Sequence, residues 1–225
     1  MTVLALSVLV ASAQPRLFVK PNEPLGEGKG IHPGRVAWIH SPGVATWDGE
    51  TGLWVEGRWN DQQKADAMVR QAVMTVAGAK SPKAAWKALF KNFNKTHGKG
   101  NKGYKKGEKI AIKLNMNNAI THRDTIELNS SPYVTLALLR SLINDGGVRQ
   151  QDVIVCEPSR AITDSIYDKC HHEFPYGLKL FKRFFLLLRE TSIEFFLIYA
   201  YQLYEFVHSR PSLDIPFVRT DVAVI

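Results

Sequence analysis

The chain has 225 residues, of which 45% are hydrophobic, and its formal net charge is +8. This length fits one large domain, and the hydrophobic fraction suits a buried core but excludes a multispanning membrane protein. Two cysteines are too few for a scaffold held by several disulfides. Much of the positive charge lies in one lysine-rich segment, so it is a local feature and not a field over the whole surface.

The first 13 residues, MTVLALSVLVASA, form an apolar run that ends in Ala11, Ser12 and Ala13. Small residues at these positions are typical of a secretory cleavage site. We therefore expect residues 1–13 to be a signal peptide and the protein to be exported, to the periplasm or to the outside of the cell. The usual positively charged start is missing, and the alternative is a buried first strand. Residues 14–34 are rich in proline and glycine and predict an extended N-terminal arm.

Between residues 35 and 175, short apolar segments alternate with segments of helical periodicity. Asn60 is the expected cap of the first helix, with Gln63 in a capping box, and a serine-proline pair opens each of the next two helices. The elements expected in chain order are a strand at Arg35–Ser41, a helix at about 61–76, a helix from Ser81-Pro82, a strand at Ile110–Leu114, a helix from Ser131-Pro132, a strand at Val153–Pro158 and a helix from Ser159 to Lys169. This order predicts an α/β fold with a mostly parallel sheet, crossover helices and three layers.

Polar residues follow each of the three predicted strands. Because parallel strands end at the same edge of a sheet, these residues are expected to meet at the carboxyl edge, where open α/β sheets bind ligands. The three segments are His40–Gly43, Asn115–Asn118 and Glu157–Arg160. The sequence therefore predicts a ligand site at this edge.

Lys113 lies inside a predicted strand, where a charged side chain is costly to bury. We expect its ammonium to bind a carboxylate or phosphate, beside Asn115 and Asn117, which share its side of the strand. The helix opened by Ser131 directs its N-terminal amides to the same edge, which favours an anion. The expected ligand-binding residues are Lys113, Asn115, Asn117, Ser131, Ser159 and Arg160, and the candidate catalytic residues are Glu157, as acid or base, and Lys113. The alternatives are a purely structural ion pair between Lys113 and Glu157, and asparagines that only cap turns.

Other motifs favour structure over ligand chemistry. The weak metal candidates Cys170, His171 and His172 are adjacent in a helix, cannot all reach one ion and have no second ligand set nearby, so no metal site is expected. No cysteine run typical of an iron–sulfur cluster is present in the sequence, and the sequence does not identify any other cofactor. Seven lysines between Lys91 and Lys109 lie among glycine and asparagine, and we interpret this segment as a solvated loop and not as a nucleic-acid surface.

The composition changes at residue 176. Residues 176–225 hold seven of the eleven phenylalanines, without a clear helical or strand period. Charged residues interrupt the run of about 20 apolar residues that a membrane span needs, so no stable span is expected. We interpret this segment as an atypical hydrophobic tail that arose from a frameshift or a misjoined gene fragment; the alternative is a buried helix pair that completes the domain.

The segments IAIKLNMNN, NSSPYVTLALLRSLINDGG and VIVCEPSR together resemble the domain-of-unknown-function 362 (DUF362) family. The upstream stretch HPGRVAWIHSP with WDG, and the loop THGKG…GYKKGEK, resemble the exported bacterial branch of this family. The family pattern combines a strand that ends in I-K-x-N, a helix opened by Ser-Pro, and a second strand that ends in Glu or Gly with Ser. The matching residues are Lys113 and Asn115, Ser131 and Pro132, and Glu157 and Ser159. The resemblance covers roughly residues 30–175 and implies an α/β domain. Family members continue with further α/β structure, so the domain at 35–175 is expected to be incomplete, truncated or frameshifted after about residue 175.

Two functions are expected from these observations. One is an exported enzyme fragment, redox- or metal-linked, that acts on a small anionic substrate. The other is a non-catalytic module that binds such a ligand at the same sheet edge. Some relatives in the resembled family carry ferredoxin-type iron–sulfur modules, whereas this sequence has no such motif.

Overall fold

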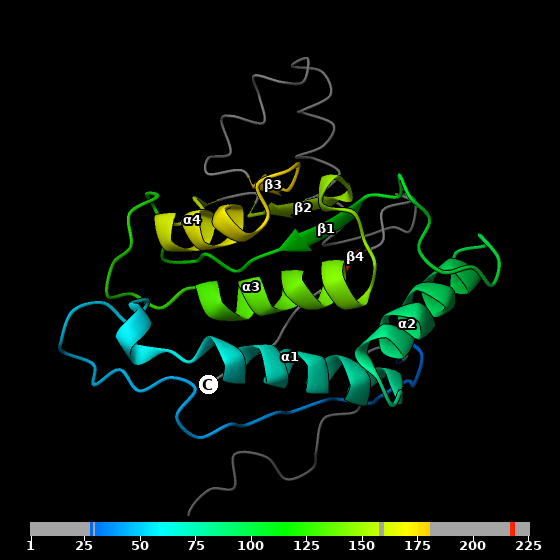
Figure 1. Ribbon diagram of the computed structural model, residues 1–225, viewed down its shortest axis with the longest axis horizontal. Coiled ribbons are helices and arrows are strands. Elements are labelled where there is room, and N and C mark those ends of the chain that lie inside the picture. Colours follow the sequence, from blue (N-terminus) through cyan, green and yellow to red (C-terminus); the bar gives the residue numbers. More distant parts are fainter. Residues whose placement is uncertain (1–27, 29, 158–159, 181–216, 219–225) are drawn as a thin grey trace, which may run out of the picture.

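The computed structural model describes residues 28, 30–157, 160–180 and 217–218 (Figure 1). In this part of the chain, helices and short strands alternate. They are α1 (Gln62–Ala77), α2 (Pro82–Thr96), β1 (Ile110–Lys113), α3 (Pro132–Arg140), β2 (Val153–Cys156), α4 (Asp164–Glu173), β3 (Lys179–Leu180) and β4 (Phe217–Val218). Short helical turns lie at Gly57–Trp59, at Ser141–Asp145 directly after α3, and at Gln150–Asp152 before β2.

The strands form one small parallel sheet in the order β3-β2-β1-β4. In the register of the central pair, Ile110 lies opposite Val153 and Lys113 lies opposite Cys156. The ladder continues one residue further, because the backbone N–H of Leu114 donates to the carbonyl of Cys156 at 2.9 Å. The fold is therefore mixed α/β with a parallel sheet, as predicted.

The core lies between the sheet and α3. Connections between parallel strands are right-handed, and β1, β2 and β3 are neighbours in this order, so α3 and α4 lie over the same face. α3 runs between the sheet and α1 (Figure 1). The sheet buries its alternate residues toward these helices, and α3 is buried along most of its length. The central core residues are Ile110, Ile112, Val153, Val155, Leu136 and Leu139.

Two serine-proline starts are confirmed as helix starts. The hydroxyl of Ser81 accepts a hydrogen bond from the backbone N–H of Ala84 at 3.3 Å, which caps α2. The hydroxyl of Ser131 accepts from the N–H groups of Tyr133 at 3.2 Å and Val134 at 3.5 Å, which caps α3. Each proline occupies a position whose N–H would have no partner within the helix.

The predicted cap of the first helix is wrong by one residue. The carboxylate of Asp61, and not Asn60, accepts from the backbone N–H of Lys64 at 3.0 Å, so the capping box with Gln63 does not form. The Asn60 side chain instead donates to the carbonyl of Trp54 at 2.7 Å and thereby stabilises the loop that precedes α1. Both residue types cap helices well, so sequence alone distinguishes them poorly.

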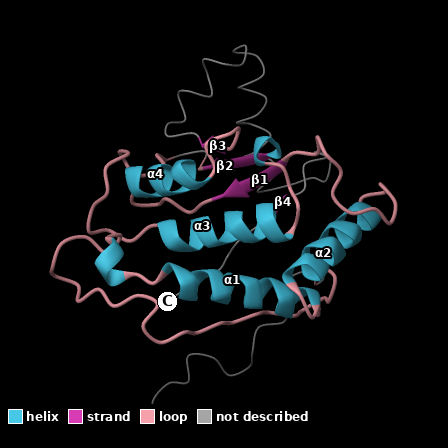
Figure 2. Ribbon diagram, viewed as in Figure 1, coloured by secondary structure: helices cyan, strands magenta, loops and turns pink. Residues whose placement is uncertain are grey.

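The predicted strand at Arg35–Ser41 is also wrong. This segment has no regular structure, and Figure 2 shows it as loop. The side chains of Val36 and Trp38 are 85% and 76% exposed, and no described strand pairs with the segment. The segment His40–Gly43 therefore does not follow a strand of the sheet.

The last predicted helix begins later than expected. α4 starts at Asp164 and not directly after Ser159, which lies outside the described residues. Its first turn is capped from a distant loop, because the carboxylate of Asp124 accepts from the backbone N–H of Ser165 at 2.9 Å. A cap from a distant loop leaves no local pattern in the sequence.

Several predicted segments lie wholly or mainly outside the described residues. They include the signal peptide at 1–13, most of the arm at 14–34 (residues 14–27 and 29), and most of the tail. The first residues of the tail are described, and there Lys179–Leu180 form β3 beside β2. Within the described ranges, no helix combines the length and the apolar character needed to cross a membrane.

Candidate functional site

Lys113 and Glu157 lie together at the carboxyl edge of the sheet. Lys113 is the last residue of β1, and Glu157 directly follows β2. The Lys113 Nζ lies 3.1 Å from the Glu157 Oε2. The Glu157 side chain is only 5% exposed, whereas that of Lys113 is 31% exposed. The site therefore joins a buried carboxylate to an ammonium that solvent can reach.

The ammonium of Lys113 has two further acceptors. It donates to the Oδ1 of Asn115 at 2.7 Å and to the carbonyl of Leu114 at 3.2 Å. An ammonium has three N–H groups, and the three acceptors satisfy all of them. An anion can therefore bind Lys113 only by replacing one of these acceptors. The Asn115 amide is the replaceable one, because Asn115 is exposed and uncharged.

The start of α3 lies at the same edge. The backbone N–H of Asn115 donates to the Ser130 hydroxyl at 3.0 Å, and the Ser130 N–H donates to the Asn115 carbonyl at 3.1 Å. These bonds fix Ser131 and the helix N-terminus next to the end of β1. The Ser131 hydroxyl itself is occupied by capping, so a bound anion would gain from the helix N-terminus more than from this hydroxyl.

Asn117 and Arg160 form a second pair on this edge. The Arg160 Nε donates to the Asn117 carbonyl at 3.3 Å. Next to it, the backbone N–H of Ala161 donates to the carbonyl of Ala119 at 3.2 Å. The Asn117 side chain is exposed. Of the predicted site residues, the structure thus brings Lys113, Asn115 and Glu157 into direct contact and joins Asn117 to Arg160.

The loop after β1 contains polar residues that sequence reasoning missed. The His122 Nδ1 lies 2.9 Å from the Asp164 Oδ2, and the Asp124 Oδ1 accepts from the Ser165 hydroxyl at 2.6 Å. These contacts tie the loop to the start of α4. Their partners are about forty residues away in the chain, so no local spacing signals them.

Cys156 lies beside the site but is poorly suited to nucleophilic chemistry. It is opposite Lys113 in the sheet register. Burial, and to a lesser extent the negative charge of Glu157, raise the pKa of its thiol to about 11, and the opposite effect of the Lys113 charge is smaller. The thiolate is the reactive form of cysteine, so this thiol is largely unreactive at neutral pH.

The weak metal candidates at the end of α4 are not brought together. Cys170 is buried in the core, and burial raises the pKa of its thiol to about 12. His171 stacks on the ring of Tyr167 with a centroid distance of 5.3 Å, and His172 is exposed. Among the residues the structure describes, no group of three or more His, Cys, Asp or Glu side chains is arranged to hold a metal ion.

A buried carboxylate organises the opposite, amino edge of the sheet. Asp152 is fully buried and accepts hydrogen bonds from two side chains of the loop before β1, Tyr104 at 2.5 Å and Lys109 at 2.9 Å. Further bonds at 2.9 Å come from the N–H of Gly107 and the Nε of Arg149. Burial alone would raise the pKa of Asp152, but these hydrogen bonds outweigh it and hold the pKa well below its usual range. The lysine-rich loop is therefore anchored to the domain.

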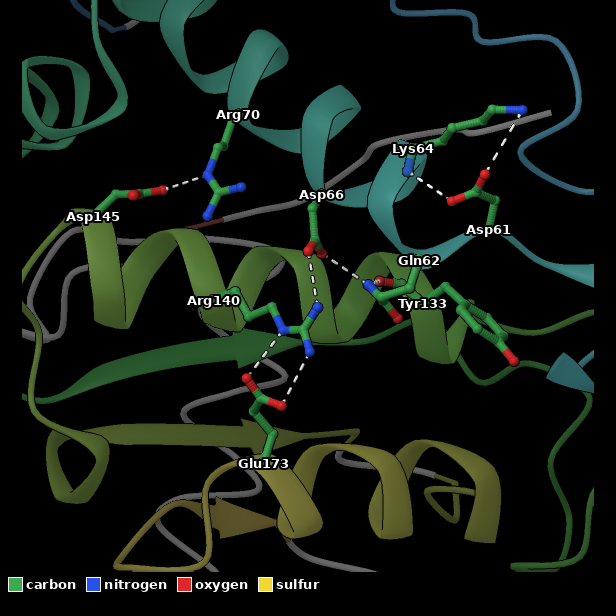
Figure 3. A network of polar contacts seen from close by, with 9 residues as sticks. All are labelled: Asp61, Gln62, Lys64, Asp66, Arg70, Tyr133, Arg140, Asp145 and Glu173. Carbon is green, nitrogen blue, oxygen red and sulfur yellow. Dashed lines mark hydrogen bonds and ion pairs between the residues drawn. The ribbon is translucent and has the colours of Figure 1, made fainter.

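A second network joins three helices (Figure 3). Arg140 of α3 donates to Asp66 of α1 at 2.8 Å and makes two parallel bonds, at 3.0 and 3.1 Å, to Glu173 of α4. Asp66 also accepts from the Gln62 amide at 2.8 Å. One guanidinium can bind both carboxylates, because its five N–H groups point in fixed directions within one plane. This network ties α1, α3 and α4 together, and it includes none of the residues that contact Lys113.

Comparison of this chain with protein-family models, with curated proteins and with solved structures finds no match. The resemblance to the DUF362 family therefore stays a prediction from the sequence. The candidate site is defined by its own geometry: a lysine, a buried glutamate and exposed asparagines at the end of a parallel sheet.

Proposed function

We propose that the carboxyl edge of the sheet binds a small anion, a carboxylate or a phosphate, through Lys113. The observation that carries the proposal is the mixed environment of the ammonium. Glu157 and the Leu114 carbonyl hold it from the protein side, and its third acceptor is an exposed amide of Asn115. A charged acceptor binds an ammonium more strongly than an amide does, so an anion would replace Asn115 there.

The neighbouring groups support an anion more than a cation. Lys113 and Arg160 contribute two positive charges to this edge, against the negative charge of Glu157. Once released from Lys113, the Asn115 amide can turn its own N–H groups toward the ligand. The N-terminus of α3 beside Asn115 adds a favourable partial charge.

We infer that binding, and not turnover, is the main role of the site. Catalysis would assign Glu157 as acid or base, but its carboxylate is buried and ion-paired, and the thiol of Cys156 beside it has a raised pKa. The enzymatic form of the proposal, redox- or metal-linked, rests on the position of Glu157 at a sheet edge that commonly carries active sites.

The wider context of the proposal is an exported domain with three layers, in which the described residues supply the sheet and the helices on one of its faces. The residues of the second sheet face are Ala111, Lys113, Ile154 and Cys156, whereas α3 and α4 cover the first face. A second helix layer over that face would complete the architecture that the resemblance to the DUF362 family implies. Such a layer would also supply the other wall of the anion site.

The proposal is tested by calorimetric titration of the protein with inorganic phosphate and with succinate. We expect saturable binding of at least one of them, its loss in Lys113→Met, and unchanged binding in the matched control Lys179→Met, at an exposed position of β3. Thermal unfolding of each variant shows whether it is folded. Absence of binding of either anion to the folded wild-type protein would overturn the proposal.

A further inference from the structure

The positive charge of this protein is concentrated in one segment. Residues 67–109 contain eleven of the 29 basic residues and one of the 21 acidic residues, so the rest of the chain carries a net charge of −2. Ten of these basic residues lie between residues 67 and 107, where no acidic residue occurs. Such asymmetry is the usual electrostatic footprint of a surface that meets a polyanion.

The fold arranges part of this charge in a row. Four lysines spaced four residues apart share one side of α2, because a helix repeats every 3.6 residues. The row spans about 18 Å at a rise of 1.5 Å per residue. The opposite side of the helix, with Trp86 and Phe90, is buried in the core. We call the row the α2 lysine face, and it consists of Lys83, Lys87, Lys91 and Lys95.

Among the residues that the structure describes, no carboxylate forms an ion pair with the α2 lysine face. Three of its four lysines are exposed and the fourth, Lys91, is half-buried. The ion pairs formed within the described part of the chain include none of the four. Like charges four residues apart on a helix repel each other, so the row weakens the isolated helix. A partner that carries negative charge would relieve this repulsion.

The loop after α2 extends the charged surface. The Asn94 amide donates to the carbonyls of Lys102 and Gly103 at 2.9 and 3.2 Å, and Tyr104 is fixed by Asp152. The loop is thereby held against the C-terminal end of α2, at the upper right of that helix in Figure 1. Its lysines at 102, 105 and 106 are exposed. Together, the helix and the loop offer a two-dimensional set of ammonium groups.

We propose that the α2 lysine face and the loop 99–106 form a docking surface for a bilayer that contains anionic phospholipids. A bilayer presents phosphates in a plane, and each lysine near it adds to the attraction. The apolar side of α2 is already buried in the core, so docking is electrostatic and does not insert the helix. The loop leads into the start of β1, whereas Lys113 lies at the end of β1. The proposed docking surface and the Lys113 site therefore lie at opposite edges of the sheet.

The residue types favour a lipid surface over a nucleic acid. The one arginine of the segment, Arg70, pairs with Asp145 at 2.8 Å, so no arginine fork is offered to a phosphate or a base. The rings that single-stranded nucleic acids stack on are also engaged. Tyr104 packs on Phe90, and Phe93 stacks on His97 with a centroid distance of 4.0 Å.

Flotation with phosphatidylcholine vesicles, with and without phosphatidylglycerol, tests this proposal. We expect the wild-type protein to bind only the phosphatidylglycerol vesicles and to be released by high salt. The double variant Lys87→Gln/Lys95→Gln is expected to bind roughly 30-fold more weakly, from the usual contribution of each lysine near an anionic surface. The matched control Arg123→Gln/Lys179→Gln removes the same charge from exposed positions elsewhere and is expected to bind within about twofold of wild type.

Three outcomes would overturn the docking surface. They are absence of wild-type binding to phosphatidylglycerol vesicles, equal binding to pure phosphatidylcholine, and an equal loss in the control variant. Displacement of the protein from vesicles by duplex DNA or RNA at equal phosphate concentration would also overturn it and would assign the surface to a nucleic acid. Circular dichroism of both variants confirms that they are folded, since the substituted side chains are exposed.

Discussion

The ammonium of Lys113 lies 3.1 Å from the carboxylate of Glu157, although the two residues are 44 positions apart in the chain. Parallel pairing of β1 with β2 creates this contact, because it places the ends of both strands at one edge. The pair has a structural role, because it places an opposite charge beside a buried carboxylate. In the proposed anion site, the pair also keeps Lys113 at the sheet edge, where an anion can replace Asn115 as the third acceptor of the ammonium.

The Asp152 network predicts acid sensitivity at the opposite edge. The pKa of Asp152 is depressed in the folded state, so its contribution to stability is complete above the unfolded pKa of about 3.9 and is lost as the pH falls below it. We expect Asp152→Asn to lower the free energy of unfolding by about 2 kcal/mol at neutral pH, because four donors lose a charged acceptor. We also expect the variant to lose less stability than wild type between about pH 5 and pH 2.

Urea unfolding across this pH range measures both effects. Asp61→Asn is the matched control, because asparagine caps a helix as well as aspartate does. Equal pH dependence of Asp152→Asn and wild type would show that Asp152 is not the group responsible.

Arg140 is expected to contribute more to the stability of the fold than Arg70, whose ion pair is more exposed. Arg140→Met leaves Asp66 and Glu173 without their shared partner, and we expect a loss of about 3 kcal/mol in unfolding free energy. Arg70→Met breaks the more exposed pair with Asp145 and is expected to cost less than about 1 kcal/mol. Denaturant unfolding compares the two, and equal losses would contradict the assigned role of Arg140.

Ser131 separates stability from binding. Its hydroxyl caps α3, so Ser131→Ala is expected to cost about 1 kcal/mol of stability. Phosphate or succinate affinity is expected to change by less than about twofold, because the hydroxyl is engaged in capping α3 and is not expected to contact the ligand. Calorimetric titration beside thermal unfolding checks this. A loss of binding without a loss of stability would instead make Ser131 a direct ligand contact.

The two thiols are expected to be protected in the native protein. Burial raises the pKa of Cys156 to about 11 and that of Cys170 to about 12. Reaction with a chromogenic disulfide reagent at pH 8 should therefore be slow in the folded protein and fast in denaturant. Glu157→Gln should lower the pKa of Cys156 and speed its reaction, with Cys156→Ser identifying which thiol reacts. Fast native reaction of Cys156 at pH 8 would contradict its placement.

The elements with local signals were predicted from the sequence. β1 and β2 are short apolar runs, and α2 and α3 begin at Ser-Pro pairs whose capping bonds span only two or three residues. The segment Arg35–Ser41 has the composition of a strand, but strand formation depends on a pairing partner elsewhere in the chain. Composition alone cannot supply that partner.

The candidate site was predicted only in outline. The meeting of Lys113 with Glu157 followed from the expected parallel strands. The saturation of the ammonium by Asn115 and Leu114 depends on side-chain conformation, which no sequence pattern specifies. The contacts of Arg140 and Asp152 join residues between 33 and 74 positions apart, except for the local pair of Asp152 with Arg149, and they were missed for the same reason.

The most direct test of the account is the effect of Glu157→Gln on anion affinity. This change removes the negative charge that repels an anion beside Lys113 but keeps the side-chain shape and a hydrogen-bond acceptor for the ammonium. Loss of one close opposing charge is expected to tighten phosphate or succinate binding by roughly tenfold in calorimetric titration. Binding that is unchanged, weaker or absent in a folded Glu157→Gln variant would contradict anion recognition by Lys113 and would leave the pair with a structural role alone.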